Sequence, residues 1–409
     1  MTAKERILAA WHGRPVDYVP LTTWCFGLQP PPSLRWQRDG REISHWYSLR
    51  MEHLHTIPQG WTLQDDFNRV LAWRSLGVDD ILDVSVPWSI DPEVSWSDSR
   101  QPAQGEQYPV LTREYVTPAG RLRHAVSLTG EEQADGWVVQ PNDLPLIEDY
   151  NIPRAVKQAV STPADIPAIR HLFAAPDAAA RRWFTERMAQ ISAFAAPHGV
   201  PVQAWSAFGM DGLVWLTGTE GAIMLALEEP EAFARLLEII TETDYARTEL
   251  AATTPGVDMI VERGWYSSTD FWSPTLFEEF LFAHIRTLAD LAHRHGKPFG
   301  YVMTTGVEIL GPRLADAGVD VLYFVDPIQD RIPLQRAVEL LGDRMTLVGG
   351  TNALSLAAGD RERVRAEVQQ AMATLAPTQR FILHPVDAVF PDTPWEGIEW
   401  LIEAWQHTR

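Results

Sequence analysis

The chain has 409 residues, one cysteine and a formal net charge of −20, with 54 acidic side chains against 34 lysines and arginines. A single cysteine excludes a disulfide framework and a metal site built from cysteines alone, and the negative charge argues against nucleic acids as ligands. No apolar run is long enough to span a membrane and no signal-peptide pattern opens the chain, so we expect a cytoplasmic protein that binds a small, neutral or cationic molecule.

The first part of the chain predicts a short helical extension followed by strands. Residues 3–12 are amphipathic and end at Gly13, which predicts a helix. A β-like run follows at 18–24, helical material lies within 49–77, and a buried strand is expected at 81–88.

The segment 95–140 has a different pattern. Its polar and apolar side chains alternate, and the sequence TPAG at 117–120 has the composition of a tight turn. We therefore expect a β-hairpin insertion around 95–140.

From about residue 177 the chain alternates regularly between helices and strands. The expected helices are 178–196, 220–250, 274–295, 306–317, 334–341, 361–375 and 395–406, and the expected strands are 200–207, 257–262, 298–303, 319–326, 345–350 and 380–384. With the two earlier strands this makes eight βα units with no domain-length linker. The sequence therefore predicts an α/β fold with a single (β/α)₈ barrel domain over 1–409. A doubly wound open sheet is the alternative, but no strand is followed by GxGxxG.

In such a barrel the functional side chains follow the carboxyl ends of the strands. The positions considered at these strand ends are Trp24, Cys25, Phe26, Pro87, Trp88, Trp205, Ser206, Phe208, Glu262, Arg263, Trp265, Tyr266, Tyr301, Met303, Thr304, Asp326, Thr351, Asn352, His384 and Asp387. Several aromatic side chains among them are expected to form the walls of a pocket, although each large ring has packing as its ordinary role.

The ionisable candidates each have a structural alternative. Glu262 is either a buried functional carboxylate or the ion-pair partner of Arg263. Asp326 precedes a proline, so it is either functional or the first residue of a turn. His384 and Asp387 end the last strand and are candidates for a direct role.

Several runs of the chain resemble the uroporphyrinogen decarboxylase superfamily. They are ERILAAWHGRPVDYVPLTTW at the start, then SPTLFEEFLFAHIRTLADLAHRHGKPFGYVMTTG, ILGPRLADAGVDVLYFVDP, LVGGTNALSL and FILHPVDAVFPDTPWEGIEWLIEAW. The resemblance implies a (β/α)₈ barrel, often as a homodimer. It also implies either cofactor-free porphyrinogen decarboxylation or methyl transfer together with a corrinoid-binding partner protein.

The chain departs from both branches of that superfamily. The arginines that bind substrate carboxylates in the decarboxylases are replaced after the first strand by TTWCFGLQPPPS. The zinc ligands of the methyltransferases fall on Tyr301, Met303 and Asp387, and these groups do not make a zinc site. We therefore expect neither bound metal nor a tightly held cofactor.

The preferred hypothesis is a methyltransferase that demethylates a small methoxylated or methylated-amine substrate and passes the methyl group to a corrinoid on a partner. Glu262 or Asp387 would hold or protonate the leaving group, and Tyr301 would orient it. Aromatic rings would surround the substrate, helped by further lining residues. The substrate-binding set is Trp24, Trp88, Trp205, Ser206, Phe208, Trp265, Tyr266, Met303, Asp326 and His384.

Three other interpretations remain open at this point. A cofactor-free decarboxylase of a small aromatic or heterocyclic acid would hold the carboxylate on Arg263 and protonate the product from Asp387 or Tyr301. A non-catalytic barrel would bind a small molecule without turning it over. An oxygen/nitrogen metal site would require Glu262, His384 and Asp387 to converge.

Overall fold

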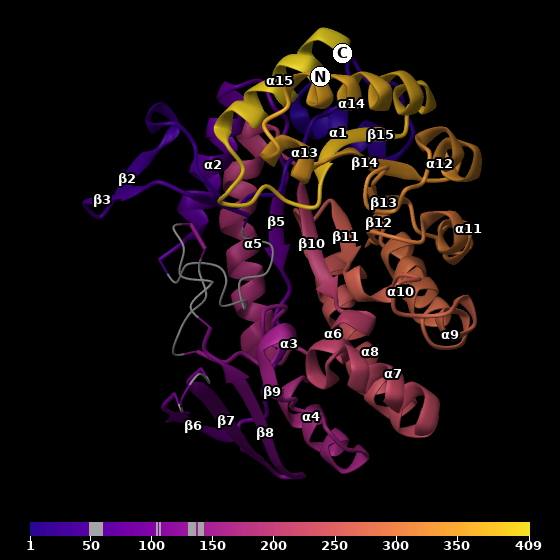
Figure 1. Ribbon diagram of the computed structural model, residues 1–409. Helices are drawn as coiled ribbons and strands as arrows, with labels where there is room; N and C mark the ends of the chain where they lie inside the picture. Colours follow the sequence, from indigo (N-terminus) through magenta and orange to yellow (C-terminus); the bar gives the residue numbers. More distant parts are fainter. Residues whose placement is uncertain (49–59, 104, 106–107, 130–135, 138–142) are drawn as a thin grey trace.

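The computed structural model describes residues 1–48, 60–103, 105, 108–129, 136–137 and 143–409 (Figure 1). Seven parallel strands form its central sheet. In spatial order they are β15 (Phe381–Val386), β14 (Thr346–Asn352), β13 (Val321–Val325), β12 (Phe299–Val302), β11 (Met259–Glu262), β10 (Val202–Ala207) and β5 (Leu82–Ser85). The spatial order follows the chain order without reversal, so every crossover moves in the same direction. This is the topology of a barrel wall and not that of a doubly wound sheet.

The sheet is a half-barrel, and the predicted first strand is much shorter than expected. Within the expected range Leu21 forms an isolated parallel bridge with Leu383 of β15, and Cys25 just after it forms a second one with Val389. The amide of Thr22 donates to Leu383 O at 3.0 Å, and the amide of Leu383 donates to Pro20 O at 2.9 Å. The α/β barrel class predicted from the sequence is confirmed, with an eighth position held by a bridge.

The helices that follow the strands agree with the predicted alternation except at two breaks and at two short helices, 209–217 and 353–357, that were not expected. They are α5 (Ala178–His198), α6 (Gly209–Thr217), α7 (Thr219–Glu228), α8 (Pro230–Thr253), α9 (Pro274–Phe280), α10 (Phe282–Arg294), α11 (Val307–Ala317), α12 (Leu334–Leu341), α13 (Ala353–Ala357), α14 (Arg361–Leu375) and α15 (Trp395–Thr408). The single helix expected at 220–250 is two helices, because Pro230 has no amide hydrogen to continue a helix and instead begins α8. The helix expected at 274–295 is interrupted at Leu281.

The predicted insertion is a four-stranded antiparallel sheet at one end of the molecule (Figure 1). Its strands are β6 (Ser95–Gln101), β7 (Val110–Thr117), β8 (Gly120–Ser127) and β9 (Ala155–Lys157). The expected hairpin joins β7 to β8 through the two residues Pro118 and Ala119. Between β8 and β9 lies the short helix α3 (Asn151–Arg154), and α4 (Ile166–Leu172) follows β9.

Shorter elements complete the amino-terminal region. Two antiparallel pairs join β1 (Phe26–Leu28) to β4 (Trp46–Tyr47) and β2 (Trp36–Arg38) to β3 (Arg41–Ile43). Helix α2 (Leu63–Ser75) accounts for the described part of the helical material expected within 49–77, and residues 49–59 lie outside the described chain. In the described part of the chain, no helix combines the length and apolar character that crossing a membrane requires.

Strand register divides the side chains into an inner and an outer set. Asp83, Gln203 and Tyr323 meet inside the barrel, where Gln203 Nε2 donates to Asp83 Oδ1 at 2.6 Å and the Tyr323 hydroxyl donates to Gln203 Oε1 at 2.8 Å. Because successive residues of a strand face opposite sides, Ala204 and Ser206 of β10 face outward.

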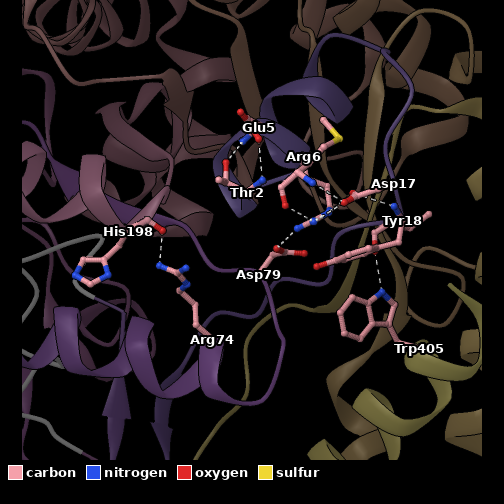
Figure 2. A network of polar contacts seen from close by, with 11 residues as sticks. Thr2, Glu5, Arg6, Asp17, Tyr18, Arg74, Asp79, His198 and Trp405 are labelled. Atoms are coloured by element: carbon pink, nitrogen blue, oxygen red, sulfur yellow. Dashed lines mark hydrogen bonds and ion pairs between the residues drawn. The ribbon is translucent and has the colours of Figure 1, made fainter.

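The amino-terminal helix α1 (Ala3–Trp11) is held to the barrel by a buried arginine (Figure 2). Arg6 donates to Asp17 Oδ1 at 2.6 Å through Nε and to Asp79 Oδ1 at 2.7 Å through Nη1. The indole nitrogen of Trp405 donates to Val19 O at 2.8 Å. These contacts join α1, the strand-like segment after it and the last helix in one network.

Candidate active site at the barrel mouth

A pocket of about 360 Å³ lies at the carboxyl ends of the strands. Its lining combines six aromatic rings, three carboxylates and one cationic side chain. The lining residues are Phe26, Asp149, Tyr150, Arg263, Trp265, Tyr266, Asp270, Phe271, Thr304, Gln329, Asp387 and Phe390. The volume is at the small end of the range for ligand pockets, which suits a small organic molecule.

Trp265 connects the pocket to the interior of the barrel. Its indole N–H donates to Oδ2 of Asp387 at 3.2 Å, so the loop after β11 orients a carboxylate on the loop after β15. Its ring stacks on Trp205, with centroids 5.9 Å apart and planes inclined by 21°. Trp205 is anchored in turn, because its indole nitrogen donates to Asp83 Oδ1 at 2.7 Å.

The floor beneath Trp265 is a packed aromatic cluster. Trp24 lies 5.1 Å from Trp205, 5.2 Å from Tyr323 and 5.3 Å from His384, measured between ring centroids. His384 is fully buried, with Nδ1 3.0 Å from the hydroxyl of Thr22 and Nε2 3.3 Å from the backbone oxygen of Asp387. Trp24, Trp205 and His384 therefore support the pocket from below and do not line it.

Arg263 is held between two carboxylates and two indole rings. Its Nε donates to Asp211 Oδ2 at 2.9 Å, and its Nη2 donates to both oxygens of Asp149 at 3.1 and 2.9 Å. The guanidinium carbon lies 4.2 Å from the ring centroid of Trp265 and 4.6 Å from that of Trp215. The charge of Arg263 is thus already matched within the protein before any ligand binds.

Tyr266 completes this network at the pocket wall. Its amide donates to Asp211 Oδ1 at 2.9 Å and its hydroxyl donates to Asp149 Oδ1 at 3.1 Å. Burial and the neighbouring Asp149 raise the pKa of the Tyr266 phenol well above its ordinary value, so the phenol stays protonated. Burial also raises the pKa of Asp211 to about 6, against the opposing effect of Arg263.

Glu262 and Tyr301 do not line the pocket. They are register partners in β11 and β12, on the outer face of the sheet. Glu262 is fully buried, with Oε1 3.2 Å from Nε2 of His284 on α10. Burial raises the pKa of Glu262, and His284 offsets part of that increase. The hydroxyl of Tyr301 lies 2.5 Å from that of Ser267.

The other predicted residues are also part of the framework. The hydroxyl of Ser206 lies 2.8 Å from that of Thr248 on α8. Trp88 and Phe208 have centroids 5.8 Å apart and pack in a separate cluster on the outside of the barrel wall with Arg247.

Met303 and Asp326 are buried and are not among the lining residues of the pocket. Met303 is fully buried. Asp326 begins a turn, as one of its two interpretations expected, with Oδ1 accepting from the amide of Ile328 at 2.8 Å and Oδ2 accepting from Nδ2 of Asn352 at 2.7 Å.

The donor set does not fit zinc. Of the positions that correspond to zinc ligands in the related methyltransferases, one is a phenol hydrogen-bonded to Ser267 and one is a thioether. Glu262 faces the opposite side of the barrel wall from His384, so the alternative oxygen/nitrogen site is not assembled either. Within the described ranges, no three His, Cys, Asp or Glu side chains are grouped as metal ligands would be.

About half of the residues that line the pocket were not predicted from the sequence. Asp149 and Tyr150 lie between β8 and β9, in a proline-rich segment where no periodic pattern pointed to a site. Asp270, Phe271, Gln329 and Phe390 lie further into the loops than the strand-end rule reaches. Phe26 and Thr304 did satisfy that rule.

Comparison with known proteins gives three related results. A family model described as uroporphyrinogen decarboxylase (URO-D) matches residues 153–408. The chain is 25% identical over 207 residues to the methylcobamide:CoM methyltransferase MtaA of Methanosarcina barkeri, which covers 48% of this chain and 56% of MtaA. The matched part of the chain therefore spans only about half the length of that curated relative. A methyltransferase structure from Methanosarcina mazei superposes with a TM-score of 0.56 and 17% identity, covering 100% of this chain and 99% of that one, which shows a shared fold.

Proposed function

This chain belongs to the uroporphyrinogen decarboxylase family, and from that premise we propose that it transfers a methyl group from a small methoxylated or methylated-amine substrate to a corrinoid carried by a partner protein. The similarity to MtaA supports methyl transfer and a corrinoid partner. The barrel-mouth pocket supports a small substrate with apolar methyl groups, since six of its lining side chains are aromatic.

The observation that carries the proposal against decarboxylation is the state of Arg263. A decarboxylase must neutralise a substrate carboxylate, and Arg263 is the only cation among the described lining residues. Its charge is already matched by Asp149 and Asp211. A carboxylate substrate would add a negative group to a pocket whose described lining contains more carboxylates than cations, which favours methyl transfer from an uncharged or cationic donor.

Asp387 is the side chain that we assign to the reacting group. It lines the pocket, is half-buried, and is oriented by Trp265. When a methyl group leaves an ether oxygen as CH₃⁺, the C–O electron pair stays on oxygen and that oxygen gains a proton. A carboxyl group at this position would supply the proton. When the methyl group leaves a quaternary nitrogen, the C–N pair remains on nitrogen and no proton is required.

We propose that this transfer proceeds without a zinc thiolate. The reduced corrinoid of the partner supplies the nucleophile that accepts the methyl group. The protein then has to hold the donor in line, exclude water and stabilise the leaving group. The aromatic lining and Asp387 are positioned for those three tasks.

An anaerobic transfer assay tests the proposal. The purified protein is mixed with reduced cobalamin and, in separate reactions, a methoxybenzene derivative and a methylated amine, and methylated cobalamin is followed by its absorbance. We expect methylation from at least one donor, and with the methoxybenzene derivative a turnover about tenfold or more lower for Asp387→Asn, because only the ether oxygen needs a proton. Glu362→Gln, on the outer surface of α14, is the matched control.

Two results would contradict the proposal. One is CO₂ release from an aromatic acid with no methylation of cobalamin from any donor. The other is an Asp387→Asn variant that turns over the methoxybenzene derivative at the rate of Glu362→Gln.

A further inference from the structure

We infer that Asp149 occupies a receptor for a carboxylate group at the pocket wall and so determines the specificity of the barrel-mouth pocket. The pocket excludes carboxylate ligands while Asp149 is present and accepts them when its side chain is removed. The inference deepens the proposed function and rests on it in one respect, that this pocket is the substrate site. It concerns binding, and so it can be tested without the transfer reaction.

Three side chains donate hydrogen bonds to the carboxylate of Asp149. The indole nitrogen of Trp215 donates to Oδ1 at 2.7 Å, the hydroxyl of Tyr266 donates to the same oxygen at 3.1 Å, and Nη2 of Arg263 donates to both oxygens at 3.1 and 2.9 Å. An indole N–H and a guanidinium can only donate, and the phenol stays protonated because its pKa is raised. One cation and two neutral donors thus match a carboxylate with two oxygens.

The donors are held by contacts that do not involve Asp149. Nε of Arg263 donates to Asp211 Oδ2 at 2.9 Å, and the guanidinium carbon lies 4.6 Å from the ring centroid of Trp215. Asp211 and Trp215 are both on α6, and Arg263 directly follows β11, whereas Asp149 comes from the chain between β8 and β9. Removing the carboxylate of Asp149 therefore leaves the donors oriented, and a site with oriented donors binds its ligand at a lower entropic cost.

The receptor opens into the pocket. The side chain of Asp149 is 30% exposed and lines the pocket, whereas Arg263 is 4% exposed. A ligand carboxylate in the wild-type pocket faces the like charge of Asp149, and the donors that could bind it are already engaged. Without that side chain Arg263 keeps one partner, Asp211, and a ligand carboxylate would supply the second.

Titration calorimetry with benzoate and benzamide tests the inference. The two probes have nearly the same shape, both suit an aromatic lining, and they differ in charge. For the wild type we expect benzamide to bind more tightly than benzoate by on the order of tenfold, because benzoate meets the charge of Asp149 and finds Arg263 paired.

The variant Asp149→Ala should invert this preference. We expect benzoate to bind to it at least about tenfold more tightly than to the wild type, and the affinity for benzamide to change by about twofold or less. Asp270→Ala is the matched control, because it removes a carboxylate from the same lining. Asp270 accepts from the hydroxyl of Thr305 at 2.7 Å, so its removal leaves Arg263 paired, and its benzoate affinity should stay within about twofold of the wild type.

An unchanged benzoate affinity in folded Asp149→Ala overturns the inference, and so does an equal gain in Asp270→Ala, which would be a general effect of charge. Tighter binding of benzoate than of benzamide by the wild type also overturns it, and this comparison still decides if Asp149→Ala does not fold. These failures differ from failure of the proposed function. Methylation of cobalamin by the wild type, with no gain of benzoate binding in Asp149→Ala, would leave methyl transfer standing and remove only the role of Asp149.

Discussion

The indole N–H of Trp265 donates to Oδ2 of Asp387 at 3.2 Å, so two loops that are far apart in the sequence meet at the wall of one pocket. Trp265 follows β11 and Asp387 follows β15, and the stack of Trp265 on Trp205 fixes the indole from below. The orientation of the carboxylate therefore depends on packing inside the barrel.

Replacing Trp265 by Phe keeps an aromatic ring and removes the donor. A hydrogen bond to a charged group contributes about 1.5–3 kcal/mol, so we expect methyl-transfer turnover to fall by about tenfold to a hundredfold. The apparent affinity for the methyl donor should fall less than turnover, because most of the ring is retained. Trp395→Phe is the control, since the Trp395 indole also donates to a carboxylate, that of Glu399, at 3.0 Å on the exposed surface. Equal kinetics of the two variants would contradict this role for Trp265.

Replacing Arg263 by Gln should act mainly on stability. The change leaves Asp149 and fully buried Asp211 without their cation, and breaking such a pair costs about 3–5 kcal/mol. Urea denaturation measures this loss. Arg365→Gln on the exposed face of α14 should stay within about 0.5 kcal/mol of the wild type. A further Asp211→Asn change should recover part of the lost stability, and no recovery would show that the two groups are not coupled.

The contact between α1 and the barrel predicts a pH-dependent stability. The hydrogen bond from Arg6 holds the pKa of Asp17 well below its usual range. A carboxylate with a depressed pKa in the folded state stabilises the protein above its unfolded pKa of about 3.9, and this contribution is lost as the pH falls through the folded value.

The variant Asp17→Asn measures that contribution. We expect it to lower the free energy of unfolding at neutral pH by about 1 kcal/mol or less, since the side chain of Asp17 is 38% exposed. The difference from the wild type should shrink as the pH is lowered below about 4. Asp343→Asn, at another exposed aspartate, is the control, and a difference that grows toward acid would be the wrong sign.

Cys25 should be unreactive in the folded protein. Burial raises the pKa of its thiol to about 12, so the thiolate is scarce at pH values of about 8. A thiol-specific reagent is expected to modify the native chain slowly and one thiol per chain rapidly after denaturation in urea. Cys25→Ala should retain methyl transfer. Rapid labelling of the native protein would show that the segment after Leu21 opens.

The sequence was sufficient to predict the barrel, because each strand is a short apolar run and most helices are followed by a residue that ends them. The helix expected at 361–375 has the observed bounds, and Gly318 ends α11 as predicted. The single helix expected over 220–250 was wrong at Pro230, because a proline has no amide hydrogen to continue a helix and here begins a new one. The shortness of the first strand depends on pairing with Leu383, which no local pattern reveals.

The site was harder to predict than the fold, because a position near the end of a strand does not determine to which side of the sheet its side chain points. Arg263, Trp265, Tyr266 and Asp387 follow their strands and reach the pocket. Glu262 is the last residue of its strand and keeps the alternation of β11, which turns it toward α10. Val261 is the register partner of Trp205 and faces inward. Because successive residues of a strand face opposite sides, Glu262 faces outward.

The antiparallel insertion supplies Asp149, one of the two carboxylates that pair with Arg263, and so it affects which ligands the pocket can bind. β5 and β10 are neighbours in the sheet, so the chain between them can be exchanged without changing which strands touch. Asp149 is supplied by that stretch, whereas Trp265 follows β11 and Asp387 follows β15, outside it. A related chain with a different connection between these strands would therefore lack one of the two carboxylates that match the charge of Arg263, while Asp211 of α6 would still hold its Nε.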